Sequence, residues 1–226
     1  MLADRLVEAG VDPPLAARLA EFGVRLLAAN ARTNLTGAKT PEDLLPHLLD
    51  CLTLLPYVRG PLVDVGSGGG LPAIPLALAL GIDVTLIEST GKKCIFLESA
   101  MRDFGIAGRV LAGRAEDIGK DSAFRERFAC GTARAVAAAP TVLELVLPLV
   151  AVGGVAVLQR GRFERPEREA VADAAPMLGG LPREVIRLSG ERCLLIVDKK
   201  SATPGRYPRR AGIPEKRPLC LGARKA

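Results

Sequence analysis

The chain has 226 residues, of which 31 are Lys or Arg and 25 are Asp or Glu, so its formal net charge is +6 at pH 7. Hydrophobic residues make up 49% of the chain, which excludes disorder over its whole length. No apolar run approaches the roughly 20 residues that a bilayer requires, and charged residues close to Met1 interrupt any secretory signal. We therefore expect one compact, monomeric, cytoplasmic domain with short additions.

Cysteine and histidine are scarce in this sequence. The five cysteines never form a Cys-x-x-Cys pair, and the single histidine, His47, stands outside any Cys/His cluster. A zinc site would lack ligands, so we expect no metal. A Ser-His-Asp or Cys-His mechanism would need His47 as its only general base, and no Gly-x-Ser-x-Gly turn precedes a predicted helix. The composition therefore argues against a hydrolase.

Residues 1–58 are predicted to form a helical cap. Apolar residues recur at helical spacing after Pro13 and stop near Asn34. A second helix is expected to begin at Thr40, which forms a capping box with Asp43. Because Pro46 lies inside this second helix, we expect a kink or a later start there.

Between residues 59 and 198, short β-like runs alternate with helical ones, which is typical of a parallel sheet covered by helices. The predicted strands are Leu62–Val65, Val84–Ile87, Arg109–Ala112, Thr132–Ala135 and Val155–Leu158, and the predicted helices are Pro72–Leu80, Lys92–Phe104, Pro140–Val150 and Arg165–Met177. Two final strands, Glu184–Leu188 and Cys193–Val197, are joined by a short hairpin connection and should be antiparallel. The predicted fold class is α/β, with a Rossmann-like, doubly wound sheet of seven strands.

Residues 199–226 form a basic tail that contains several prolines. They include nine basic residues and one acidic residue, a net charge of +8, so the preceding 198 residues sum to −2. Such a concentration of charge favours a polyanionic partner such as RNA, and Tyr207 is a candidate for stacking on a base. The alternative interpretation is that residues 199–226 form a solvated extension that binds no RNA.

A glycine-rich turn follows the first predicted strand and contains Gly66, Gly68 and Gly70. Glycines at a strand-to-helix turn permit positive φ angles and let a ligand approach the backbone closely. Glu88 ends the second predicted strand, where a carboxylate accepts hydrogen bonds from the two hydroxyls of an adenosine ribose. This order of elements indicates a site for a cofactor that contains adenosine.

Two features argue against a dinucleotide as that cofactor. The third glycine of Gly-x-Gly-x-x-Gly would fall at Leu71, and Pro72 and Pro75 remove amides that a pyrophosphate would use. S-Adenosylmethionine has no phosphate, and Asp64 followed by the glycine turn resembles the cofactor motif of class I methyltransferases. An NAD-dependent oxidoreductase is the alternative interpretation.

Signatures of some methyltransferase chemistries are missing from the sequence. It contains no Asn/Asp-Pro-Pro-Tyr/Phe turn for an exocyclic amino group, and none of its cysteines follows a proline, as the nucleophile for carbon-5 of cytosine typically does. A ring nitrogen already has a free lone pair, so an enzyme that aligns donor and acceptor needs no base. The pattern favours methylation of a ring nitrogen.

Nearly the whole chain resembles the bacterial small-subunit ribosomal RNA methyltransferase G family, also called the glucose-inhibited division protein B family. The segments that carry the resemblance are Asn34–Thr36, His47–Asp50, Asp64–Pro72, Gly91–Lys93 with Phe96–Leu97, Gly113–Glu116, Thr132–Ala135 and the closing block Arg206–Leu219. The resemblance implies a class I methyltransferase fold, S-adenosylmethionine as cofactor, and methylation of N7 of a guanine in 16S rRNA. It makes 16S rRNA or the small ribosomal subunit the expected partner. An RNA-binding or assembly protein without catalysis is a further alternative.

The resemblance and the predicted sheet edge also supply candidate site residues. The cofactor candidates are Asp64, Gly66, Gly68, Leu71, Glu88, Ala115, Glu116 and Arg134. By resemblance, Ala115 and Glu116 meet the adenine, whereas Arg134 reaches both cofactor and target base and so positions the reactants. The candidates for binding RNA are Lys92, Lys93, Arg160, Arg206 and Arg209. Gln159-Arg160-Gly161 replaces the family's more typical Leu-Lys-Gly, which leaves open whether Arg160 takes over the role of that lysine.

Overall fold

The computed structural model describes residues 1–134, 136–188 and 190–221. The predicted strand end at Ala135, the hairpin residue Ser189 and the tail residues Arg224 and Lys225 lie outside the described residues. The helices are α1 (Leu2–Glu8), α2 (Pro13–Thr33), α3 (Pro41–Leu52), the 3-10 turn η1 (Leu55–Tyr57), α4 (Ala73–Leu80), α5 (Gly91–Asp103), α6 (Ala115–Ile118), α7 (Ala139–Val146), α8 (Arg165–Met177) and α9 (Ile213–Lys216). The strands are β1 (Leu62–Val65), β2 (Val84–Glu88), β3 (Gly108–Ala112), β4 (Phe128–Arg134), β5 (Val150–Arg160), β6 (Gly180–Pro182), β7 (Ile186–Arg187) and β8 (Cys193–Lys199).

All of these strands belong to one sheet, whose order is β3-β2-β1-β4-β5-β8-β6, with β7 also paired to β8. Strands β1 to β5 are parallel, and β8 is antiparallel to β5, β6 and β7. Because β6 and β7 share one edge of β8, the sheet is seven positions wide, which confirms the predicted mixed sheet. The strand order reverses between β1 and β4, so a crevice is expected at the carboxyl ends of these two strands.

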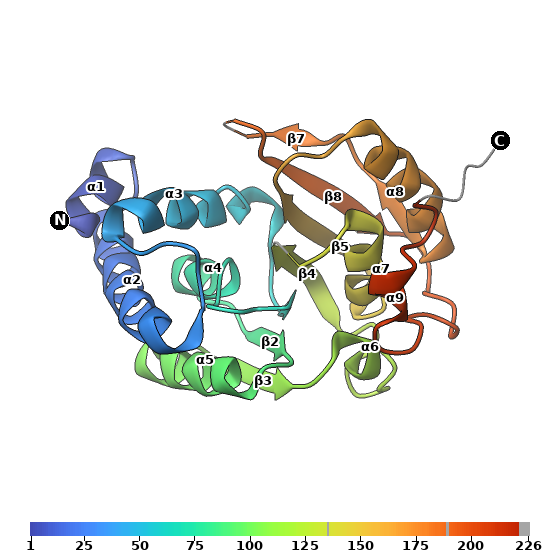
Figure 1. Ribbon diagram of the computed structural model, residues 1–226, viewed down its shortest axis with the longest axis horizontal. Coiled ribbons are helices and arrows are strands. Elements are labelled where there is room, and N and C mark those ends of the chain that lie inside the picture. The colour runs from blue at the N-terminus through green and yellow to red at the C-terminus, as the bar shows by residue number, and fades with distance from the viewer. Residues whose placement is uncertain (135, 189, 222–226) are drawn as a thin grey trace.

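Helices cover both faces of the sheet (Figure 1). Successive residues of a strand point to opposite faces, so Leu62 joins the core beneath α2 to α5, whereas Val63 joins the core beneath α7 and α8. The central strands have no polar face, as expected for a parallel sheet buried on both sides.

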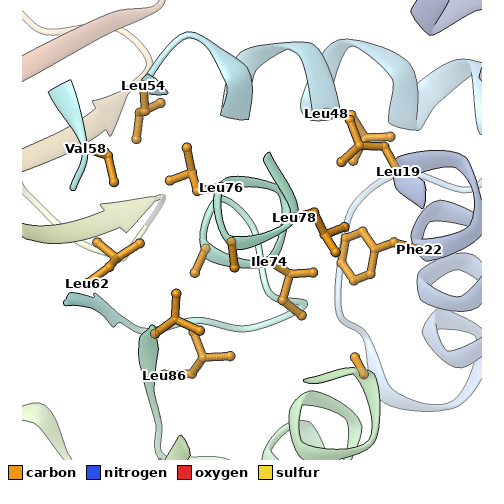
Figure 2. Packing of buried hydrophobic residues seen from close by; sticks show 14 of the residues in the cluster. Leu19, Phe22, Leu48, Leu54, Val58, Leu62, Ile74, Leu76, Leu78 and Leu86 are labelled. Carbon is orange, nitrogen blue, oxygen red and sulfur yellow. The ribbon is translucent and has the colours of Figure 1, made fainter. Parts of the chain in front are cut away.

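The N-terminal helices are joined to the sheet through α4 (Figure 2). Ile74, Leu76 and Leu78 on this helix are buried, and they lie between strand residues such as Leu86 and cap residues such as Phe22. The predicted cap therefore shares one continuous core with the sheet, and it holds α3 over the carboxyl end of β4.

Several predicted boundaries were wrong for identifiable reasons. Helix α3 continues through Pro46, so the later start is not observed, while the Thr40–Asp43 capping box is confirmed. Strand β4 begins four residues before its predicted start, because Gly131 interrupts its β-like pattern; a Cβ on Gly131 would lie 2.5 Å from Val146. Helix α7 ends at Val146, two residues before a proline, and Val150 already belongs to β5.

The predicted tail is packed against the body as far as the structure describes it. Lys199 is the last residue of β8 and is fully buried, with its Nζ 2.6 Å from the Leu147 carbonyl and 3.1 Å from Glu126. The boundary predicted at residue 199 thus falls within a strand. Tyr207 is only 5% exposed, so its ring is not accessible for stacking on a base. Among the described residues, no helix has both the length and the apolar character needed to cross a membrane.

Candidate active site

The glycine turn lies at the carboxyl end of β1, and all three of its predicted glycines have positive φ. A Cβ on Gly66 would lie 2.7 Å from Val136, and one on Gly70 would lie 2.5 Å from Ile74. At Gly68 the nearest atom would be a backbone oxygen 3.8 Å away. The positive φ angles favour glycine at all three positions, and a Cβ would also collide at Gly66 and Gly70, whereas Gly68 leaves space over the backbone for a ligand.

Glu88, at the end of β2, is fixed against this turn. Its carboxylate accepts hydrogen bonds from the amide of Gly68 at 3.0 Å and from that of Thr90 at 2.8 Å, and the residue is only 7% exposed. A carboxylate has about four acceptor positions, so two amides leave capacity for further donors. This arrangement fits the ribose-binding role that the sequence predicted for Glu88.

Asp64 is buried beneath the turn. Its Oδ1 accepts a hydrogen bond from the Thr132 hydroxyl at 2.7 Å, while its Oδ2 has no partner among the described residues. Burial raises the pKa of Asp64 to about 7, against the opposing effect of the Thr132 hydrogen bond. A cationic group beside this carboxyl would favour its ionised form, so Asp64 suits the ammonium end of the cofactor.

The wall opposite the turn is formed around Glu116, at the start of α6. Its Oε1 accepts hydrogen bonds from the Gly212 amide at 2.8 Å and from Arg114 at 3.2 Å. Burial raises the pKa of Glu116, but the hydrogen bonds from Gly212 and Arg114 outweigh it, so the pKa lies below its ordinary value. Because Gly212 belongs to the closing block, the C-terminal segment completes this wall.

Gly66, Glu88 and Glu116 line a recess of about 100 Å³ at the switch point of the sheet, together with Ala115 and Leu145. Asp64 and Gly68 lie beside this recess but do not line it. Val136 lines both this recess and a second cavity of about 550 Å³. The walls of the second cavity come from α3, from the ends of β4 and β5, and from the residue before β8; they include His47, Asp50, Arg134, Gln159, Arg160 and Arg192. The two cavities are thus neighbours beside the end of β4.

Arg134 faces the second cavity and is held there by α3. Its Nη2 lies 2.6 Å from His47 Nδ1, and its Nη1 lies 3.3 Å from the His47 carbonyl oxygen. Burial and then the charge of Arg134 lower the pKa of His47, so the imidazole is neutral at pH 7 and Nδ1 serves as an acceptor. Arg134 was predicted to position the reactants, and His47 in turn holds Arg134 in place.

Arg160 reaches the second cavity from β5. It donates to Glu167 at 2.7 Å and to the carbonyl of Ala137, and its side chain is 14% exposed. Its Nε is buried without a partner among the described groups. Arg160 thus lies where the prediction placed it, with part of its charge already neutralised by Glu167.

The other RNA candidates lie outside both cavities. Lys92 and Lys93 occupy the first turn of α5, and Arg206 is exposed in the C-terminal segment. Arg209 is different, because its guanidinium and amide bind the fully buried carboxylate of Glu144 at 2.6–3.1 Å. Arg209 therefore forms a structural ion pair inside the fold, and its role as an RNA ligand stays a prediction.

Part of the second cavity was not predicted from the sequence. Asp50, Gln159 and Arg192 were not candidates, although Asp50 is buried and binds Arg192. The signal that could have found Asp50 was its i, i+3 spacing from His47 on a predicted helix, which places both side chains on one face. Leu71 follows the turn but lines neither cavity.

A doubly wound sheet with a glycine turn after β1 and a fixed carboxylate at the end of β2 is typical of the S-adenosylmethionine-dependent methyltransferases. Residues 16–195 match the family model described as rRNA small subunit methyltransferase G, GidB. The chain belongs to this family, and the predicted cofactor and activity, methylation of a guanine in 16S rRNA, are confirmed at that level.

Curated relatives agree with this assignment, and a solved structure shows the same fold. The chain is 44% identical over 209 residues to ribosomal RNA small subunit methyltransferase G of Rubrobacter xylanophilus, covering 86% of this chain and 80% of that protein. It is 39% identical over 230 residues to the protein of the same name from Deinococcus deserti, covering 96% and 94%. Geranyl diphosphate C-methyltransferase from Streptomyces coelicolor, solved with S-adenosyl-L-homocysteine, matches with a TM-score of 0.54 at 14% identity, covering 67% and 78%, and shows the shared fold.

Proposed function

We propose that the two adjoining cavities bind the two reactants: the recess at the glycine turn binds S-adenosylmethionine, and the larger cavity binds the target guanine of 16S rRNA. The observation that carries this proposal is the position of Val136, which lines both cavities. Ligands that fill the two cavities would meet beside this residue and next to Arg134. When bound, the cofactor supplies an electrophilic methyl group on a sulfonium centre.

Residues in and beside the recess would each bind a different part of the cofactor. Glu88 would accept hydrogen bonds from the ribose hydroxyls, and Asp64, buried beneath the turn rather than in the wall of the recess, would balance the charge of the ammonium group. Glu116 would accept from the adenine, since only one of its oxygens is bound by Gly212 and Arg114. The cofactor then needs no phosphate site, in keeping with the prolines at the start of α4.

The larger cavity would bind and orient the base rather than activate it. N7 of guanine carries a lone pair, so no group has to remove a proton before transfer, and alignment supplies the catalysis. An arginine such as Arg134 can donate to O6 of the guanine, which leaves the lone pair of N7 free to attack the methyl group. His47 is neutral and hydrogen-bonded to Arg134, so it serves as a positioning residue instead of a base.

The test is transfer of a labelled methyl group from S-adenosylmethionine to small subunits, or to free 16S rRNA, prepared from cells that lack the activity. We expect label at N7 of one guanine, and none in RNA that already carries the modification. If the protein binds both ligands but transfers no label, it is an RNA-binding protein and the proposal fails. Thermal stabilisation by S-adenosylhomocysteine and none by NAD would exclude the oxidoreductase alternative.

We also propose that the exposed basic residues of the C-terminal segment contact the RNA: Arg206, Arg210, Lys216 and Arg217. Changing these four to serine should weaken RNA binding and lower the slope of log K against log salt by roughly 0.7 for each phosphate that the protein no longer neutralises. The point changes avoid a deletion that would remove buried Lys199. Salt titrations of RNA binding are the measurement, with Arg5→Ser and Arg102→Ser as controls on distant exposed charges. An unchanged slope would remove the segment from the RNA interface.

A pH dependence is expected from His47. Its neighbours are Arg134 and Arg192, which lower its pKa, and Asp43 and Asp50, which raise it. Because the folded pKa lies below the unfolded value of about 6.5, the unfolded chain binds more protons in acid, and stability falls as pH drops below that value. Protonation would also cost Arg134 its acceptor, so methyl transfer should fall in the same range.

The matched variant is His47→Asn, whose Oδ1 can replace Nδ1 as an acceptor but does not titrate. It should retain activity at pH 7.5 and lose the acid-side decline that denaturation and rate profiles between about pH 5 and 8 show for the original chain. Identical profiles for the two proteins would contradict this role of His47.

A further inference from the structure

Two more cavities extend from the larger one along the outer edge of the sheet. Arg192 lines both the proposed guanine cavity and a neighbouring cavity of about 220 Å³. The latter shares Phe163, Arg168, Val185 and Arg187 with a third cavity of about 420 Å³. Together they form a groove between the start of α8 and the short strand β7, which lie next to each other in Figure 1.

The lining of this groove is mainly cationic where it meets the guanine cavity. Among the described residues of the 220 Å³ cavity, four are arginines and one is a carboxylate, Glu191. Glu191 pairs with Arg162 at 2.6 Å, but both side chains are 65% exposed, and ion pairs so exposed contribute little. A phosphate group could replace this carboxylate as the partner of Arg162 with little loss of free energy.

An aromatic ring lies in the middle of the groove. Phe163 is half-buried, and the guanidinium of Arg168 lies 5.8 Å from the centroid of its ring. The chain has only eight Phe and Tyr residues and no Trp, so an accessible ring beside arginines is uncommon in this protein. A ring next to cations is the usual platform for an unstacked base of single-stranded RNA.

We propose that the groove formed by Arg162, Phe163, Arg168, Val185, Arg187 and Arg192 binds the RNA strand directly adjoining the target guanine, with a neighbouring base on Phe163. This inference rests on the proposed function, because the groove starts at the cavity assigned to the guanine. Arg168 and Arg187 would contact the phosphates of that strand. An acidic peptide would use the same charges but would gain little from the ring, which distinguishes the two occupants.

The test compares Phe163→Leu and Phe163→Tyr with the unaltered chain in binding a single-stranded 16S rRNA fragment that contains the target. We expect Phe163→Leu to raise Kd about 5- to 150-fold, since stacking of one base is worth roughly 1–3 kcal/mol, and Phe163→Tyr to restore most of the affinity. Arg187→Gln should lower the salt slope by about 0.7. Arg165→Gln, on the same helix but outside the groove, is the matched control.

Two further readouts separate this inference from the proposed function. Binding of S-adenosylhomocysteine should be the same in all variants, and heparin, a polyanion without bases, should bind Phe163→Leu as well as the unaltered chain. Equal RNA affinity of Phe163→Leu and the unaltered chain would overturn the groove while methyl transfer by the unaltered chain still stood. A loss of heparin binding equal to that of RNA would also overturn the stacking role.

Discussion

Replacing Arg209 with leucine is expected to lower the free energy of unfolding by about 3–5 kcal/mol, the usual cost of leaving one partner of a buried ion pair uncompensated. The partner is Glu144, which is fully buried on α7 and receives hydrogen bonds from the amide, Nε and Nη2 of Arg209. Arg209→Lys should recover only part of the loss, since an ammonium cannot reproduce the two-pronged geometry of the guanidinium.

The same change should weaken cofactor binding. Leu145, next to Glu144, lines the recess, and Gly212, three residues after Arg209, donates its amide to Glu116. Loosening the segment therefore removes support from the adenine wall. Urea unfolding and titration with S-adenosylhomocysteine at a temperature where the variant remains folded measure the two effects.

The double variant Arg209→Leu, Glu144→Leu is the control for this ion pair. Removing both charges leaves no buried carboxylate, so the double variant should be more stable than Arg209→Leu alone. If Arg209→Leu lowers the free energy of unfolding by less than about 1 kcal/mol, the ion pair does not stabilise the fold as we expect.

The C-terminal segment illustrates what composition alone cannot determine. Its net charge of +8 is evident from the sequence, but the assignment of that charge depends on partners far away along the chain. Lys199 pairs with Glu126 and Arg209 with Glu144, so part of the expected RNA-binding charge is used inside the fold. Local sequence contains no signal for such pairs, because the partners are 73 and 65 residues away along the chain and meet only in the folded protein.

Elements whose pattern is local were predicted well. Strand β1, the glycine turn and Glu88 are close in sequence, and the chemistry that they imply depends on that order. Strand β6 was missed, because its three residues include Gly180 and Pro182 and pair only with β8. Three residues are too few to show a strand pattern in the sequence, and β6 forms because of its pairing with β8.

The second cavity is the part of the site that the sequence did not predict. It combines one face of α3 with the ends of β4 and β5 and with Arg192, just before β8, so its walls come from four separate parts of the chain. Arg134 was predicted by resemblance, but its hydrogen bonds to His47 depend on how the cap packs over the sheet. The cap is thus a wall of the substrate cavity as well as a cover for the core.

Replacing Glu88 with alanine is expected to weaken the binding of S-adenosylhomocysteine about 10- to 100-fold and leave RNA affinity nearly unchanged. Hydrogen bonds to a charged group contribute roughly 1.5–3 kcal/mol, and the ribose would lose its acceptor. The variant also frees the amides of Gly68 and Thr90, which loosens the glycine turn. Calorimetric titration of the cofactor product, together with RNA binding in the same buffer, measures both affinities.

Glu98→Ala provides the matched control, because Glu98 is an exposed acid on α5 and lines neither cavity. It changes net charge by the same amount, so an equal loss in both variants would point to a general electrostatic effect. Equal cofactor affinity in Glu88→Ala and the unaltered chain would remove Glu88 from the site. A selective loss in Glu88→Ala would instead tie cofactor binding to the carboxylate at the end of β2, since that carboxylate both holds the turn and faces the recess.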